Sequence, residues 1–180
     1  MSAIQIILYI IIVITIIMML YALIYNKIKT QILKINSAES EIDESLRNKY
    51  DIIIKIISEI KQIDKDNKSF KDVENIKNEE LSSFDFDRKL MDLESKIYTI
   101  RNDNSKIQKN STINNLWYDI NNINTTIKAA EKYYNESITV YNNLVTKFPS
   151  KIIAIILRYK EKSYFDGKDL YDENTKDFKI

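Results

Sequence analysis

Near its amino terminus the chain has an uncharged apolar run, Ile4 to Tyr25, that reads IQIILYIIIVITIIMMLYALIY. An α-helix rises about 1.5 Å per residue, so this run would extend about 33 Å and could cross a hydrocarbon core of about 30 Å. The run predicts a membrane-spanning helix. The residues that follow it are therefore expected to be tethered to a membrane.

A signal peptide or a buried helix fits this run less well than a membrane anchor does. A secretory signal peptide needs a basic stretch, a shorter apolar region and a small-residue cleavage site. No Lys or Arg precedes Lys27, and no A-x-A pattern leads up to Tyr25. A buried helix of a soluble protein would need apolar cover on every side, which a chain of 180 residues cannot easily supply. We expect an uncleaved anchor over residues 1–26.

The lysines next to the run predict its orientation. Lys27, Lys29 and Lys34 all follow it, and basic residues close to a membrane span are retained on the cytoplasmic side. We therefore expect a single-pass protein with its amino terminus outside and most of the chain in the cytoplasm.

The composition excludes most familiar active sites. The chain has no Cys, no His, one Gly and one Pro. Thiolate nucleophiles, Ser-His pairs, zinc sites of the usual N/S type and Gly-rich phosphate loops are therefore impossible. The 27 basic and 26 acidic residues are interspersed and do not indicate a nucleic-acid partner. We expect no enzymatic activity, no cofactor, no metal site and no small-molecule substrate.

Downstream of the run, apolar residues recur in alternating steps of three and four, the heptad spacing of packed or coiled helices. The first seam consists of Ile28, Ile32, Ile35, Ile42, Leu46, Ile53, Ile56, Ile60 and Ile63. Glu39 and Lys49 interrupt it. We expect both charged ends to reach solvent, with pairing to charges on other helices as the alternative. No Pro or Gly lies between Ser2 and Ser69, so the anchor and this helix can be continuous.

A second seam predicts another long helix. It consists of Ile113, Leu116, Ile120, Ile123, Ile127, Ala130, Tyr134, Tyr141, Leu144 and Phe148, with Ser137 as its one polar member. Pro149 follows directly and is expected to end the helix, because proline cannot continue the backbone hydrogen bonding.

Two weaker helices are expected between the seams, around Phe70 to Leu81 and from about Arg88 to Gln108. The turn over residues 82–87 contains two Ser, which favour the N-cap of a helix, and two Phe that can pack. The next turn offers Ser111 or Thr112 as the N-cap of the second long helix.

These elements predict an all-α fold, in which an N-terminal transmembrane helix precedes an antiparallel bundle of about four long helices and a short C-terminal helix. The short helix, Ile152 to Tyr159, either caps the bundle or lies on the membrane surface, and capping is favoured. The expected organisation is an anchor over 1–26, a bundle over 27–165 and a charged, mobile tail over 166–180.

Several short motifs then follow one another in a characteristic order. The first are Tyr25-Asn26 after the anchor and Tyr50-Asp51 within the stretch Leu46 to Ile53. The later ones are Tyr134-Asn135, Tyr141-Asn142, Phe148-Pro149, Ala154 and Tyr164-Phe165. This ordered set resembles the LemA family. The likeness runs from Tyr25 to Phe165, and in the middle it depends on the apolar rhythm alone.

The Tyr-Asn pairs have a structural and a functional interpretation. Tyr134 and Tyr141 lie one heptad apart on the second seam, so we expect buried rings with hydroxyl partners near Asn135 or Asn142. The alternative is a polar ladder that recognises a partner helix. Tyr50 and Asp51 are likewise expected to be structural.

The sequence departs from the family's pattern at several positions. Ile54-Lys55 stands where the family usually has Pro-Asn, and Glu39 stands where it has Trp. Asn124 replaces an acidic residue and Glu131 replaces an arginine. A polar contact between that acid and that arginine would be lost or rewired in this chain. Partner surfaces are therefore not expected to carry over.

The resemblance implies a protein of the bacterial plasma (inner) membrane with a helical bundle and no established biochemical activity. The leading hypothesis is a non-enzymatic scaffold that binds a protein partner or a second copy through its helix faces. The alternative is a membrane-organising or lipid-binding protein in which Lys27, Lys29, Lys34 and the segment 152–157 contact lipid. An enzyme would require a pocket with a carboxylate of shifted pKa.

Overall fold

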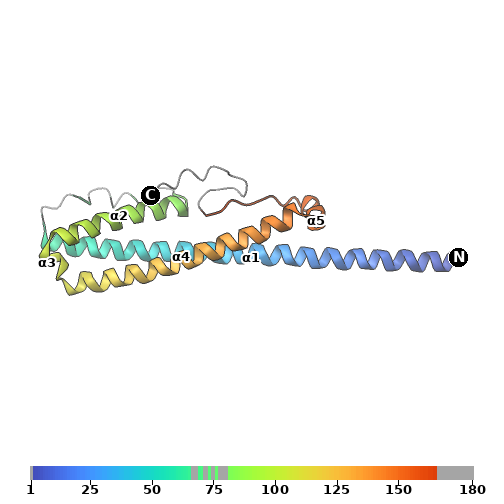
Figure 1. Cartoon of the computed structure of the whole chain (residues 1–180), viewed down its shortest axis with the longest axis horizontal. Coiled ribbons are helices and arrows are strands. Elements are labelled where there is room, and N and C mark those ends of the chain that lie inside the picture. The colour runs from blue at the N-terminus through green and yellow to red at the C-terminus, as the bar shows by residue number, and fades with distance from the viewer. Residues whose placement is uncertain (1, 66–68, 71–72, 74–75, 77–80, 166–180) are drawn as a thin grey trace. The chain divides into compact units, whose positions relative to one another are not determined.

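The computed structural model describes residues 2–65, 69–70, 73, 76 and 81–165. Over these residues the chain forms the helices α1 (Ala3–Ile63), α2 (Ser83–Asp103), α3 (Ser105–Gln108), α4 (Ser111–Thr146) and α5 (Ser150–Ile156) (Figure 1). The predicted all-α bundle is confirmed. The tail over 166–180 and most of the helix expected around Phe70 to Leu81 lie outside the described residues, so both stay predictions.

The apolar run and the first seam belong to one continuous helix, α1. Large apolar side chains from Ile4 to Leu23 are exposed along its first part. In the part of the chain that the structure describes, α1 is the one helix long and apolar enough to cross a membrane, judged by length and composition. This arrangement suits a helix surrounded by lipid, because exposed apolar groups are unfavourable in water.

The chain divides into two compact units. Met1–Ser37 and Tyr134–Ile180 form one, here called the terminal unit, and Ala38–Tyr133 form the other, here called the middle unit. α1 and α4 each contribute one part to each unit.

Among its described residues, the middle unit packs segments of α1, α2 and α4, with the short α3, around one core. Apolar side chains form its core: Ala38, Ile42, Leu46, Ile53, Ile56, Ile57, Ile60, Phe70, Val73, Leu90, Leu93, Ile97, Ile107, Ile113, Ile120, Ile127 and Ala130. Five of the nine members of the first predicted seam and four of the ten apolar members of the second are among them. Burying each large side chain contributes about 1.5–3 kcal/mol before the entropy of ordering is counted.

Contacts between side chains show the helix directions in the middle unit. Asp43 bonds to Ser83, and further along α1 Lys49 pairs with Glu94, so α1 and α2 run in the same direction. α4 runs opposite to α2, since Arg101 contacts Asn114 and Glu94 contacts Asn124. The predicted antiparallel packing is therefore found between α2 and α4, whereas α1 and α2 are parallel. α2 differs because the connection over residues 64–82 is long, and only a short loop forces antiparallel packing.

Polar side chains cap the helices of the middle unit. Ser82 precedes α2 and its hydroxyl accepts a hydrogen bond from the Asp85 backbone N–H at 3.1 Å, so α2 begins earlier than the expected Arg88. The predicted helix also breaks at Asn104, whose side chain caps α3. Before α4, the acceptor for the Ile113 N–H is Asn110 Oδ1 at 3.0 Å. Asn110 therefore has the capping role expected of Ser111 or Thr112.

The terminal unit has a small core of its own. Ile28 and Ile35 of α1 pack with Ile138, Tyr141, Val145 and Ala154, and Ile24, Ile32, Tyr134, Leu144, Tyr159 and Tyr164 surround them. Ile138 and Val145 lie outside the predicted second seam. Phe148, its predicted last member, is 81% exposed. That prediction was wrong because α4 ends at Thr146, so Phe148 no longer follows the helical period.

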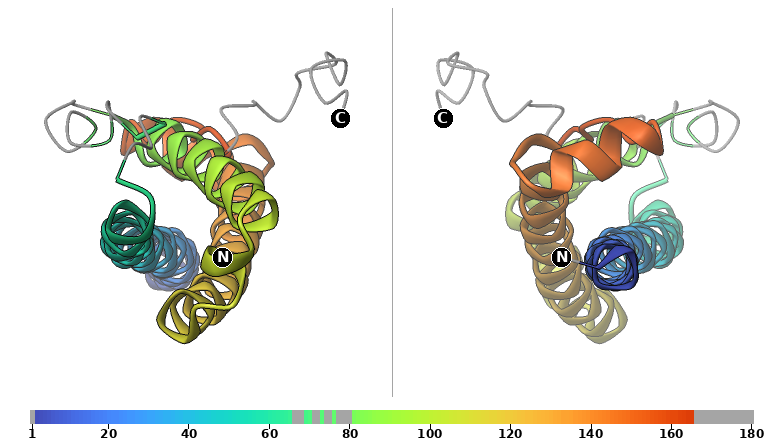
Figure 2. Two further views of the ribbon diagram at one scale, coloured as in Figure 1. Left: turned by 90° about the vertical axis from the view of Figure 1, so that its left-hand side faces the viewer. Right: turned by 90° about the vertical axis from the view of Figure 1, so that its right-hand side faces the viewer.

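α5 packs on this core with one face. Ile153 and Ala154 are buried, whereas Ile152, Ile155 and Ile156 are exposed. In the right-hand view of Figure 2, α1 is seen end-on and α5 is seen along its length, so α5 runs across the direction of α1. The expected capping role therefore describes one side of α5 only.

Candidate functional site

The candidate site is built around a buried lysine in the middle unit. Lys49 lies on the core side of α1 with 2% of its side chain exposed. Its Nζ is 3.1 Å from Glu94 Oε2 and 3.6 Å from Asp87 Oδ1, both on α2. The expectation that Lys49 reaches solvent was wrong. Two carboxylates on the neighbouring α2 balance the charge of its ammonium group inside the core. Glu39, the other charge in the first seam, is exposed.

The neighbouring α4 completes a polar cluster around this lysine. Asn124 Nδ2 donates to Glu94 Oε1 at 2.8 Å. Burial raises the pKa of the Asp87 carboxyl, and the Lys49 ammonium opposes that rise. Burial also raises the pKa of Glu131, and the negative charge of Asp87 adds to the effect. Three carboxylates therefore share the field of two ammonium groups, Lys49 and Lys128, which leaves one negative charge in excess.

A cavity of about 430 Å³ opens over the polar cluster, between α2 and α4. Met91 and Tyr98 line it from α2 and are exposed, and Trp117 lines it from α4. The Tyr98 and Trp117 ring centroids are 6.2 Å apart, and the Arg101 guanidinium lies 5.6 Å from the Trp117 ring. We call this cavity the α2/α4 groove. Aromatic and apolar side chains form one part of its lining, and we call the charged part its floor: Lys49, Asp87, Glu94, Lys128 and Glu131.

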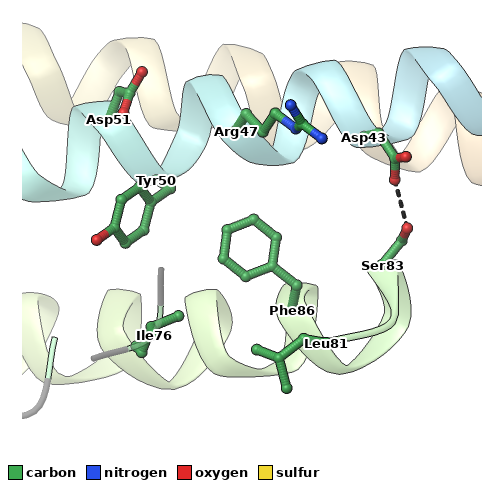
Figure 3. Close-up of a pocket in the computed structure, with 8 residues that line it drawn as sticks. All are labelled: Asp43, Arg47, Tyr50, Asp51, Ile76, Leu81, Ser83 and Phe86. Carbon is green, nitrogen blue, oxygen red and sulfur yellow. Dashed lines mark hydrogen bonds between the residues drawn. The ribbon is translucent and has the colours of Figure 1, made fainter. Parts of the chain in front are cut away.

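A second cavity of about 530 Å³ lies on another side of the middle unit (Figure 3). Tyr50 and Phe86 face each other there with ring centroids 6.0 Å apart, and the Ser83 hydroxyl donates to the Asp43 carboxylate. Arg47 and Asp51 are exposed at its edge. The Asp43 carboxylate in this lining is half-buried and is held by that hydrogen bond from Ser83. Tyr50 and Asp51, expected to be structural, lie here.

The Tyr-Asn pairs of α4 attach the segment 159–165 to the terminal unit. Asn142, fully buried, donates from Nδ2 to the Lys162 carbonyl at 2.8 Å and accepts from the Lys162 N–H at 2.9 Å. Asn135 Oδ1 accepts from the Phe165 N–H at 2.9 Å. The Tyr141 hydroxyl donates to the Lys160 carbonyl at 2.9 Å, and burial raises the pKa of that hydroxyl. We call these contacts the asparagine clamp.

Aromatic rings accompany the asparagine clamp. The Tyr134 ring meets Phe165 edge-on at 6.3 Å, and the Thr139 and Tyr164 hydroxyls are 3.1 Å apart. The structure therefore places the predicted Tyr134-Asn135 pair against Phe165, whereas the predicted Tyr141-Asn142 pair contacts the backbone of residues 160 and 162 just before Tyr164-Phe165. The contacts described here lie within the terminal unit.

The remaining predicted residues also belong to the terminal unit. Tyr25 stacks on Tyr21 at 6.2 Å, and Lys29 Nζ is 5.7 Å from the Tyr25 ring. The backbone carbonyl of Asn26 accepts a hydrogen bond from the Thr30 hydroxyl. The other members of this set are Lys27 and Lys34, which are exposed, Pro149, which precedes α5, and Ala154, which is buried.

Sequence reasoning missed the partners of Lys49. Asp87 and Glu94 are two helical turns apart on α2, beside the buried Leu90 and Leu93. That spacing could have indicated the ion pairs, because carboxylates beside the apolar face of one helix can reach a charged side chain on the apolar face of the next helix. Asn124 and Glu131, two departures from the family's pattern, also belong to this cluster. Both positions of the polar contact that we expected to be lost or rewired in this chain therefore lie in the cluster around Lys49.

The fold defines a class of all-α bundle proteins with one candidate membrane-spanning helix among the residues described. Within that class, a model of the LemA family matches residues 38–178, most of the chain. The chain therefore belongs to the LemA family. No curated protein and no solved structure matches the chain. Among the described residues, no group of three or more Asp and Glu side chains is arranged to hold a metal ion.

Replacing Lys49 with methionine tests the buried ion pairs. Lys49→Met is expected to lower the free energy of unfolding by about 3 kcal/mol, because it leaves two largely buried carboxylates without their counter-charge. Chemical denaturation in detergent measures the change. Lys96→Met is the control, since Lys96 pairs with Asp92 at the surface, and its loss should cost less than about 1 kcal/mol. Equal effects of both variants would contradict the assignment.

Replacing Glu131 with glutamine tests the excess negative charge. A carboxyl whose folded pKa is raised stabilises the protein when protonated, and this contribution is lost as pH rises through the folded pKa. Glu131→Gln is therefore expected to be more stable than the parent at pH 7, with the difference shrinking toward about pH 4. Unfolding curves across that range measure it, with the exposed Glu41→Gln as control. A pH-independent difference would count against the proposed role of charge.

Replacing Asn142 with aspartate tests the asparagine clamp. Asn142→Asp removes the donor to the Lys162 carbonyl and buries a charge, so we expect a loss of about 1–3 kcal/mol. We also expect faster proteolysis within residues 159–165. Asn121→Asp on the exposed side of α4 is the matched control. Unchanged proteolysis of the segment in Asn142→Asp would show that the clamp does not hold it.

Proposed function

We propose that this LemA-family protein is a membrane-anchored, non-enzymatic interaction protein whose middle unit binds a helix of a partner protein in the α2/α4 groove. The observation that carries the proposal is the groove itself, where exposed Met91 and Tyr98 stand beside Trp117 above a charged floor. Aromatic and Met side chains are enriched at the centres of protein interfaces, whereas isolated exposed apolar residues are ordinary.

The charge of the groove floor favours a basic partner. Asp87, Glu94 and Glu131 outnumber the two ammonium groups around them, and the pKa values of Asp87 and Glu131 are raised because burial disfavours their charged forms. A lysine or arginine from outside would offset that penalty. We therefore propose an amphipathic partner helix that carries a basic side chain among apolar ones.

The anchor is the second component of the proposal. α1 supplies a span by length and composition, and Lys27, Lys29 and Lys34 follow it. These residues support a single pass through a bacterial plasma membrane with the amino terminus outside and the groove on the cytoplasmic side.

A non-enzymatic role is proposed even though the groove contains carboxyl groups with raised pKa, which an enzyme would also require. Asp87 and Glu94 are held by the Lys49 ammonium, and Asn124 occupies a further oxygen of Glu94. Their lone pairs therefore serve internal contacts. Burial accounts for the raised pKa of Glu131, so packing accounts for the cluster without proton transfer to a substrate.

A second candidate function is supported by a different observation. The exposed apolar face of α5 and the lysines after the anchor favour a protein that binds or organises lipid. In that case the α2/α4 groove would be empty in the native membrane.

Site-specific photo-crosslinking in the native membrane tests the groove. A photoreactive amino acid at Met91 or Tyr98 of the full-length protein is expected to give one discrete protein adduct. The same group at Tyr118, which is exposed on α4 outside the groove lining, is expected to give none. Trp117→Ala should reduce the Met91 adduct severalfold, because it removes one wall of the groove.

Two outcomes would contradict the groove proposal. Adducts of equal yield at positions 91 and 118 would indicate nonspecific collisions. Absence of any protein adduct at positions 91 and 98 would reject the groove proposal and favour the second candidate function.

A further inference from the structure

We propose that α5 is an interfacial helix, lying flat in the headgroup layer of the membrane that the anchor crosses, with its exposed apolar face in the lipid. The proposal rests on the proposed anchoring by α1. It adds a lipid-binding surface that is separate from the α2/α4 groove.

The first step is the unpartnered apolar face of α5. Ile152, Ile155 and Ile156 are 54%, 64% and 66% exposed, and Phe148 is exposed just before the helix. With 3.6 residues per turn, the three Ile share one side of α5, while the buried Ile153 and Ala154 lie on the other. Four large exposed apolar side chains thus lie within nine residues, and we call them the apolar patch. Such a patch would be an aggregation liability in water.

The second step is the depth at which α5 lies. Ala154 of α5 shares a core cluster with Ile28 of α1, and Ile24 packs against the same cluster. The apolar run ends at Tyr25. Three residues of helix correspond to about 4.5 Å. α5 therefore packs at the level where the anchor leaves the hydrocarbon core.

Aromatic and basic side chains mark the same level. Tyr21 and Tyr25 are stacked, and Lys29 Nζ lies 5.7 Å from the Tyr25 ring and 6.0 Å from the ring of Tyr159, just after α5. Tyr residues at the membrane–water boundary place their rings among the headgroups, and nearby Lys side chains reach outward to phosphate. This set is the pattern expected of an interfacial belt.

The third step is the orientation and charge of α5. α5 crosses the direction of α1 (Figure 2), so an α1 that stands upright in the bilayer holds α5 in the membrane plane. Basic residues flank the apolar patch: Lys147, Lys151, Arg158, Lys160 and Lys162, against the single acidic Glu161. Such an excess is complementary to anionic lipid headgroups. An apolar face bordered by basic groups is the signature of a helix at a lipid surface.

The absence of cysteine makes the test direct, because one introduced cysteine gives one labelled position. Full-length Ile155→Cys and Ile156→Cys, carrying an environment-sensitive fluorophore, are reconstituted into vesicles of phosphatidylcholine and phosphatidylglycerol. Some vesicles contain lipids with a nitroxide near the headgroup. Tyr118→Cys, exposed on α4 of the middle unit, is the matched control.

The expected result is blue-shifted emission and severalfold stronger quenching by the nitroxide lipid at positions 155 and 156 than at position 118. Adding Ile152→Glu to the Ile156→Cys protein should reduce this quenching, because the charge disfavours insertion of the patch. Ile152 is exposed, so the substitution leaves the core intact.

Three results would overturn the proposal in distinguishable ways. Emission and quenching at 155 and 156 that equal those at 118 would place α5 in water. Blue-shifted emission without quenching by the nitroxide lipid would mean that protein covers the patch, and a second copy would be the first occupant to test. Flotation of each labelled protein with the vesicles separates the two claims. Failure to float would reject the anchor as well, whereas flotation without quenching would reject the interfacial α5 alone.

Discussion

A buried ammonium group is the constraint around which the middle unit is organised. An isolated charge is costly to remove from water, so Lys49 can lie in the core only where carboxylates meet it. The stripes of Ile and Leu on α1 and α2 are chemically uniform and would pack in several registers, one turn apart. We infer that the pairing of Lys49 with Glu94 and Asp87 selects one of these registers. The hydrogen bond from Asn124 to Glu94 then fixes the register of α4 against α2 in the same way.

The parts of the fold that depend on repeated patterns were predictable from the sequence. The heptad stripes identified most of the buried residues of α1 and α4, because every apolar side chain on one helical face contributes to the signal. The end of α4 was close to the position expected from Pro149. The apolar run likewise predicted a candidate membrane-spanning helix, and α1 meets that description by its length and composition.

The parts that depend on a single contact were not predictable in this way. Lys49 interrupts a stripe, and nothing in its own helix shows that α2 brings two carboxylates to it. The parallel direction of α2 depends on a long connection whose path is not encoded in any periodic pattern. Phe148 keeps the heptad spacing although the helix has already ended. The α2/α4 groove could not be predicted either, because it arises where Met91, Tyr98 and Trp117 from two helices fail to be covered.

The asparagine clamp shows how one side chain can substitute for a strand of sheet. Asn142 gives the backbone of Lys162 a donor and an acceptor, the same pair that a neighbouring peptide unit would offer, and Asn135 adds an acceptor for Phe165. These contacts are made with main-chain atoms, which are common to nearly every amino acid. The recognition is consequently blind to the identity of the residue at 162. The side chain at position 162 can therefore change in charge or size without loss of the attachment. The segment 159–165 can adapt to the membrane or to a partner while it stays bound to α4.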